Sequence, residues 1–298
     1  MARHLVFSPR KEWQLELTDL IRGLSGGFLF GIPLFYTMEA WWIGSSTGPP
    51  QMLALLAVTY VIVFLLNRTD GFRQIRPDGP WQAAGDSLEA IAIGVVCSLT
   101  MLILLRQITL QTPLNEIVGK TVVEGMPFAL GVALARSILK ADEDDNQKGE
   151  KAPADSSQPS QSADAVRKDT LADIGATLVG AIIIASNIAP TDEIPTLEAA
   201  LTPPWLLLLM GVSLLLSYCI VFAAGFTSQK KRMQQKGLFQ RPLTETVMSY
   251  LISLATAAAM LWFFHRVDLQ DPWILWFKDT LILGLPATIG GAAGRLTI

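Results

Sequence analysis

Long apolar segments alternate with short polar ones along the whole chain. A helix needs about 20 apolar residues to cross a hydrocarbon core of about 30 Å. We therefore predict an all-α integral membrane protein with eight transmembrane helices. They lie at approximately 20–43, 50–67, 82–106, 114–139, 170–190, 203–224, 242–265 and 273–296.

The composition agrees with this pattern. Hydrophobic residues make up 51% of the chain and charged residues only 16%, and the mean hydropathy is positive. These values are typical of membrane proteins, so the expected partner is the lipid bilayer and not nucleic acid. Cys97 and Cys219 fall inside apolar segments without a CxxC partner, which favours thiols that only fill space.

The distribution of Lys and Arg predicts the orientation. Nineteen of the twenty-three lie in the N-terminal arm, in alternate loops or near the C-terminus. The other four are Arg106, Lys120, Arg266 and Lys278. Because basic loops stay in the cytoplasm, we expect both termini on the cytoplasmic side of a bacterial inner membrane.

Two distant segments have nearly the same pattern of small residues. Gly125, Pro127 and Arg136 recur 159 positions later as Gly284, Pro286 and Arg295. Further upstream the shift is 154, and it places Asp19, Thr37 and Glu39 over Asp173, Thr191 and Glu193. Matches at a fixed offset indicate an internal duplication. Four spans per copy give both copies the same topology, so we expect two parallel four-helix repeats, at 1–139 and 169–298.

The segment 140–168 is expected to join the repeats as a disordered cytoplasmic linker. It begins with four acidic residues from Asp142 to Asp145 and continues with Ser, Gln, Pro, Lys and Ala. Such a composition offers little apolar surface to bury. It is interpreted either as a remnant of gene fusion or as a regulatory tether.

Three predicted spans contain a Gly-x-Pro sequence near their middles. The pairs are Gly31 with Pro33, Gly125 with Pro127, and Gly284 with Pro286. Proline removes a backbone hydrogen bond and leaves a carbonyl to be satisfied elsewhere. We expect a kink or an unwound turn that lines a cavity, or an ordinary kink filled by neighbouring side chains.

Ionisable groups inside the spans are the candidate transport-pathway residues, because a charge in the bilayer is costly. They are Glu39, Glu89, Glu124, Lys120 and Asp279. Lys120 and Glu124 are four residues apart and are expected to form an ion pair. Glu124 corresponds to Leu283 in the second copy, which predicts one asymmetric site and not two identical ones.

Five other charged residues lie near the cytoplasmic ends of the spans and are interpreted as anchors at the membrane surface. They are Asp19, Asp173, Glu245, Arg136 and Arg295. No phosphate-binding loop, dinucleotide fingerprint, zinc motif or cysteine cluster is found. The sequence therefore predicts no metal, no cofactor and no enzymatic activity.

The segment 23–42 contains Gly23, Gly31, Pro33, Thr37 and Glu39 and ends in two tryptophans. It resembles a bacterial family of multi-span integral membrane proteins whose function is unassigned. The resemblance extends over both halves and implies membrane location. It also adds interest to Glu39, but it implies no activity or cofactor.

Three functions are compatible with these features. The favoured one is a channel or carrier for a proton or small cation, with its path between the two repeats past Glu39, Glu89 and Glu124. The second is a membrane sensor or scaffold that uses the linker as its partner surface. The third is an intramembrane enzyme acting on lipid near Glu39, Thr37 and Tyr36.

Overall fold

The computed structural model describes residues 9–69, 71, 73, 79–149, 163–224 and 242–296. Of these, residues 9–12, 69, 136–149 and 163–169 are described by their backbone alone. The described residues form ten α-helices and one π-helical turn and contain no β-strand. The all-α prediction is therefore confirmed for this part of the chain.

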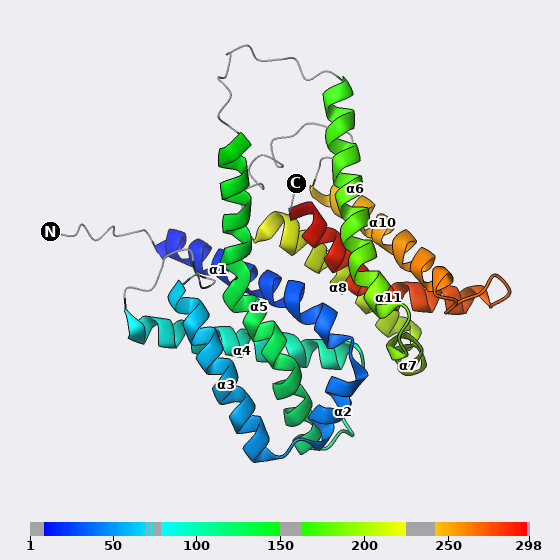
Figure 1. The fold of residues 1–298 in the computed structure, drawn as a ribbon. Coiled ribbons are helices and arrows are strands. Elements are labelled where there is room, and N and C mark those ends of the chain that lie inside the picture. Colours follow the sequence, from blue (N-terminus) through cyan, green and yellow to red (C-terminus); the bar gives the residue numbers. More distant parts are fainter. Residues whose placement is uncertain are drawn as a thin grey trace, which may run out of the picture.

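The first group of helices surrounds α5. The group consists of α1 (Pro9–Phe35), α2 (Met38–Ser46), α3 (Pro49–Thr69), α4 (Pro80–Leu104) and α5 (Leu114–Gly149). Each of the first four helices contacts α5. Figure 1 shows this group, blue to green, beside the helices of the second half.

The second group surrounds α11 in the same manner. It consists of α6 (Ala163–Ile188), α7 (Glu193–Ala200), α8 (Pro203–Tyr218), the π-turn η1 (Cys219–Ala223), α10 (Pro242–Phe263) and α11 (Trp273–Leu296). Helix α11 contacts all the others, and every residue from 281 to 292 is buried. The most enclosed helix of each group therefore carries a Gly-x-Pro sequence.

Helix boundaries follow from local sequence. Five helices begin with a proline, whose missing N–H is not needed in the first turn: Pro9, Pro49, Pro80, Pro203 and Pro242. Beyond the ends of α4 and α10, Arg106 and His265 adopt left-handed conformations, with φ of 56° and 57°. The next N–H groups return to the helix, from Gln107 to Leu102 at 2.8 Å and from Arg266 to Leu261 at 2.9 Å. Both helices therefore end in the same kind of backbone cap.

Glycines allow the central helix of each group to approach its longest neighbour. A Cβ atom on Gly26 of α1 would overlap the backbone of Gly131 in α5, and one on Gly180 of α6 would overlap Gly290 in α11. Close backbone approach through small residues stabilises helix pairs in membranes, where apolar surfaces gain little by hiding from lipid. These contacts fix how α1 and α6 lie against the two cores.

The chain contains several apolar helices of membrane-spanning length. Six described segments are both long enough and apolar enough to cross a membrane: 49–68, 80–104, 114–135, 170–188, 203–223 and 242–263. Helices α1 and α2 count as a seventh span if the bent pair crosses together. Helix α11, expected as the eighth span, is not among them, and it carries Lys278, Asp279 and Arg295.

The three Gly-x-Pro sequences do not unwind their helices. Pro33, Pro127 and Pro286 all lie inside continuous helices. The glycines at Gly31 and Gly284 instead make room for neighbouring side chains. A Cβ on Gly31 would overlap the Phe128 ring, and one on Gly284 would lie 2.5 Å from Leu254 Cδ2. The described backbone therefore contains no unwound turn at these three prolines, and a kink there stays a prediction.

The expected linker is partly helical. The backbone is helical through 140–149 at the end of α5 and through 163–168 at the start of α6. Residues 150–162 lie outside the described residues, as do the N-terminal arm before Pro9 and the basic loop 225–241. The predicted linker 140–168 therefore includes helical backbone at both ends, and disorder stays a prediction for residues 150–162.

Candidate functional site

A sharp break separates α1 from α2. The two helices meet at 92° across Tyr36 and Thr37. The Trp41 indole N–H donates to the Phe35 carbonyl at 2.9 Å, which satisfies a group that the broken helix leaves open. Tyr36 is 3% exposed, and its hydroxyl donates to the Ile282 carbonyl of α11 at 3.0 Å. The break is therefore fixed both locally and by the second group of helices.

Glu193 reaches this break from the other half of the chain. It is the first residue of α7 and is 6% exposed. Its Oε1 accepts a hydrogen bond from the Met38 backbone N–H at 3.2 Å, at the beginning of α2. A helix N-terminus favours a nearby negative charge. Its other oxygen, Oε2, is buried and has no hydrogen-bond partner among the described residues.

Glu39, the counterpart of Glu193 in sequence, is placed differently. Its side chain is exposed on α2, whereas that of Glu193 is buried. The sequence contained the Thr-x-Glu signal for both positions, at Thr37 and at Thr191. It gave no way to tell which copy turns inward, because that depends on how the two groups pack.

Glu124 is buried on the side of α5 that faces the break. It is 1% exposed, and its Oε1 has no hydrogen-bond partner in the described part of the chain. Lys120 and Phe128, one turn away on either side, share its helix face. Lys120 lies against Gly44 of α2 and Phe128 against Gly31 of α1. The Glu124 carboxyl therefore lies on the surface of α5 that is covered by α1 and α2.

The expected ion pair between Lys120 and Glu124 is not formed. Lys120 Nζ instead lies 2.7 Å from Glu116 Oε1 and donates to the Gln107 carbonyl at 3.1 Å. The long lysine side chain thus reaches toward the start of α5, where polar groups are available. This direction leaves Glu124 without the countercharge that the spacing predicts.

Asp279 is a third buried carboxylic acid. It lies in α11 at the position that matches Lys120 and is 4% exposed. Its Oδ1 is buried without a hydrogen-bond partner within the described ranges. The neighbouring Lys278 turns elsewhere and pairs with Glu198 of α7 at 2.6 Å.

Glu89 belongs to a cluster of charges and not to the buried set. Arg73, between α3 and α4, lies 2.7 Å from Glu89, 3.0 Å from Glu16 and 3.2 Å from Asp86. Burial lowers the pKa of Arg73, but hydrogen bonds and charge from Glu89 and Glu16 outweigh it and raise the pKa. The Glu89 side chain is 39% exposed, in contrast to the buried carboxyl groups of Glu124, Glu193 and Asp279. Arg73 neutralises acids from two helices.

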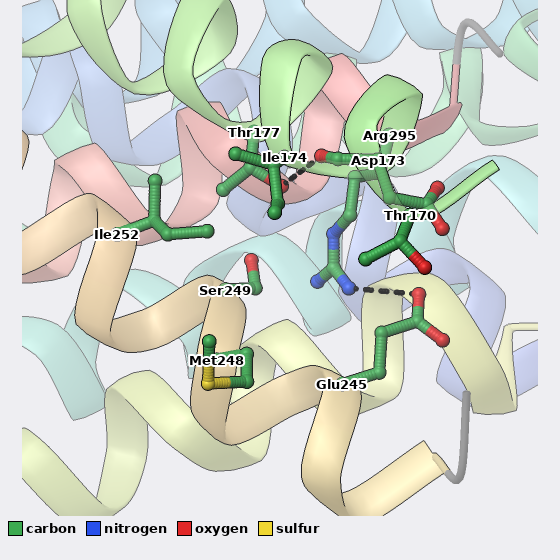
Figure 2. Close-up of a pocket in the computed structure, with 9 residues that line it drawn as sticks. All are labelled: Thr170, Asp173, Ile174, Thr177, Glu245, Met248, Ser249, Ile252 and Arg295. Carbon is green, nitrogen blue, oxygen red and sulfur yellow. Dashed lines mark hydrogen bonds and ion pairs between the residues drawn. The ribbon is translucent and has the colours of Figure 1, made fainter. Parts of the chain in front are cut away.

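A small cavity of about 80 Å³ lies between α6, α10 and α11. Figure 2 shows Arg295 of α11 pointing toward Glu245 of α10, with Asp173 and Thr170 of α6 beside them. Arg295 is 1% exposed and lies 3.1 Å from Glu245 Oε1 and 3.2 Å from Ser217 Oγ. Arg295 is therefore no surface anchor, because its charge is matched inside the helix group. The side chain of Arg136 is not described.

None of the three cavities described in this part of the chain joins the candidate acids. Two more cavities lie beside Arg106 and between Gly180 and Gly290. Neither these two nor the Arg295 cavity is lined by Glu39, Glu89 or Glu124. Within the described ranges, no three His, Cys, Asp or Glu side chains lie close enough together to hold a metal ion. The best candidate for a functional site is therefore the break between α1 and α2, where Glu193 binds the start of α2 and Glu124 lies on the face of α5 that these two helices cover.

These features define the class: an α-helical integral membrane protein with several apolar helices and acids buried among them. The chain belongs to the family described as "Putative integral membrane protein (DUF2391)", whose model matches residues 19–298. The resemblance noted for residues 23–42 is thereby confirmed over nearly the whole chain. No curated protein and no solved structure matches the chain.

Proposed function

We propose that this protein moves protons or small cations across the membrane, past the break between α1 and α2. The observation that carries the proposal is the Glu124 carboxyl, which is 1% exposed and has an oxygen without a hydrogen-bond partner in the described part of the chain. A buried acid without a partner is costly in a membrane and is typical of ion and proton pathways.

Glu193 supports the same location. It brings a second buried carboxylic acid to the break, from the other half of the chain, and holds the first N–H group of α2. Transporters commonly place their sites where discontinuous helices from two halves meet. The pair Glu124 and Glu193 therefore replaces the set Glu39, Glu89 and Glu124 as the proposed polar path.

The proposal includes two parallel repeats. Two observations support duplication beyond the sequence match: the left-handed caps at Arg106 and His265, 159 residues apart, and the equivalent contacts Gly26 with Gly131 and Gly180 with Gly290. The site itself is asymmetric, because Leu283 stands where the first copy has Glu124. The proposed orientation in a bacterial inner membrane, with both termini in the cytoplasm, rests on the positions of Lys and Arg.

Purified protein in liposomes tests the proposal directly. A pH-sensitive dye inside the liposomes, a cation-sensitive dye in a parallel set, and an imposed gradient or voltage would report flux. We expect flux with wild-type protein and a strong reduction with Glu124→Gln, which keeps the shape and removes the acid. Absence of proton and cation flux from correctly folded wild-type protein under all gradients would contradict the proposal.

A further inference from the structure

The largest of the described cavities lies between the two groups of helices, and neither Glu124 nor Glu193 lines it. Its volume is about 700 Å³, within the range of small-molecule sites. It extends from the end of α4 and the start of α5 to Trp205 of α8, and so involves both halves of the chain.

Arg106 supplies the charge of this cavity. Its guanidinium carbon lies 5.7 Å from the centre of the Trp205 ring, in a cation–π arrangement. The left-handed backbone at this residue ends α4 and directs the chain into the loop that lines the cavity. Among the described residues, Arg106 forms no ion pair and donates no side-chain hydrogen bond.

Three other basic residues near the same ends of the helices are already neutralised. Lys120 pairs with Glu116, Arg266 with Asp192 at 3.0 Å, and Lys278 with Glu198. Arg106 differs from these three residues, because its described side-chain contact is with the aromatic ring of Trp205 and not with a carboxylate. A cation at the wall of a cavity without a carboxylate beside it favours an anionic ligand.

The rest of the lining is mainly apolar. Leu99, Ile103 and Ile117 form the walls, and Gln111 adds an amide. Ile103 is 44% exposed, and the adjoining Val118 is 43% exposed, so the apolar wall continues onto the outer surface of the helices. In a membrane that surface faces hydrocarbon, which gives a ligand with an acyl chain a lateral way in.

We propose that this cavity binds an anionic phospholipid, with the phosphate at Arg106 and an acyl chain along Leu99, Ile103 and Ile117. Arginine suits phosphate because its planar group offers two parallel N–H donors. Trp205 holds the guanidinium in place from the second half of the chain. A lipid seated there contacts both groups of helices and links their association to the lipid composition of the membrane.

Native mass spectrometry of the purified full-length protein tests this assignment. Protein would be titrated with phosphatidylglycerol or phosphatidylcholine, and in a separate arm with glycerol 3-phosphate, which has the phosphate but no acyl chain. We expect tighter retention of phosphatidylglycerol, and a weakening of about tenfold in Arg106→Gln, as loss of a charge-assisted hydrogen bond implies. Trp205→Leu should weaken binding about threefold, because it removes the cation–π contact and keeps apolar volume.

Arg266→Gln is the matched control, since it removes an arginine that already has a carboxylate partner. Size-exclusion profiles and melting temperatures of the variants would establish that they fold. An equal loss of phosphatidylglycerol in Arg266→Gln, or no loss in Arg106→Gln, would overturn the proposal. Binding of glycerol 3-phosphate as strong as that of the lipid would identify a site for a soluble phosphate and also overturn it.

Discussion

The carboxyl group of Glu193 accepts a hydrogen bond from the backbone N–H of Met38 at 3.2 Å, across 155 residues of sequence. The contact joins the first turn of α7 to the first turn of α2. It makes the break in the first half dependent on an acid from the second half. The two halves of the chain therefore build this region together.

Replacing Glu193 should reveal whether its charge matters for transport. Glu193→Gln keeps an oxygen for the Met38 N–H but removes the carboxylate, so we expect liposome flux close to that of empty liposomes and a nearly unchanged melting temperature. Glu39→Gln is the control, because Glu39 is the sequence counterpart and is exposed. Equal flux in the two variants would remove Glu193 from the proposed path.

Glu124→Gln and Glu245→Gln should separate function from stability, although both remove one carboxylate. Glu124 has no charged partner in the described structure, whereas Glu245 holds the buried Arg295. We expect Glu124→Gln to reduce flux and leave stability unchanged, and Glu245→Gln to lower the unfolding free energy by roughly 1.5–3 kcal/mol. Flux per folded protein and thermal melting would be measured together. If both variants lost flux to a similar extent, the proposal that Glu124 lies on the transport path and that Glu245 has a structural role would be refuted.

The close helix contacts at glycines predict that an added methyl group lowers the stability of the protein. Gly26→Ala places a methyl group against the backbone of Gly131, so we expect a loss of about 1–3 kcal/mol in stability. Gly85→Ala adds the same methyl group in α4 with nothing within 4 Å. That control should be neutral or stabilising by about 0.5–1 kcal/mol, because glycine disfavours helix interiors. Melting curves in one detergent compare the two.

Removing Arg73 should make stability depend on pH. Arg73→Gln leaves Glu16, Asp86 and Glu89 to repel one another, at a cost of roughly 1 kcal/mol near pH 7. Protonation of the carboxylates relieves this repulsion, so the difference from wild type should shrink as the pH falls toward 4. Arg68→Gln, which alters an exposed arginine of α3, should show no such trend. A deficit independent of pH would contradict this account.

Much of the fold was predictable because it depends on local pattern. Apolar length placed the helices, and prolines such as Pro49 and Pro203 marked their starts. The break at Tyr36 was missed because no glycine or proline occupies it, whereas Pro33, three residues earlier, leaves its helix continuous. Backbone capping by Trp41 and the contact with Ile282 stabilise the break, and both depend on tertiary structure.

The site was predictable only in part for the same reason. Depth along a span correctly marked Glu124 as buried, since burial in the middle of α5 follows from the pattern. The pairing of Glu89 with Arg73 could not be predicted, because it depends on how a neighbouring loop packs. The interpretation of Arg295 as an anchor at the membrane surface was wrong, because a residue near the end of a span can be enclosed by three other helices. Side-chain direction, and not position in sequence, decides these cases.

The enclosure of α11 has a consequence for biogenesis. A helix with Lys278, Asp279 and Arg295 has a weaker tendency than its neighbours to leave the translocation machinery for lipid on its own. Its polar groups are satisfied or shielded only once α6, α7, α8 and α10 surround it. We expect the second group of helices to assemble only after α11 has been synthesised, so that this helix packs against protein and not against lipid.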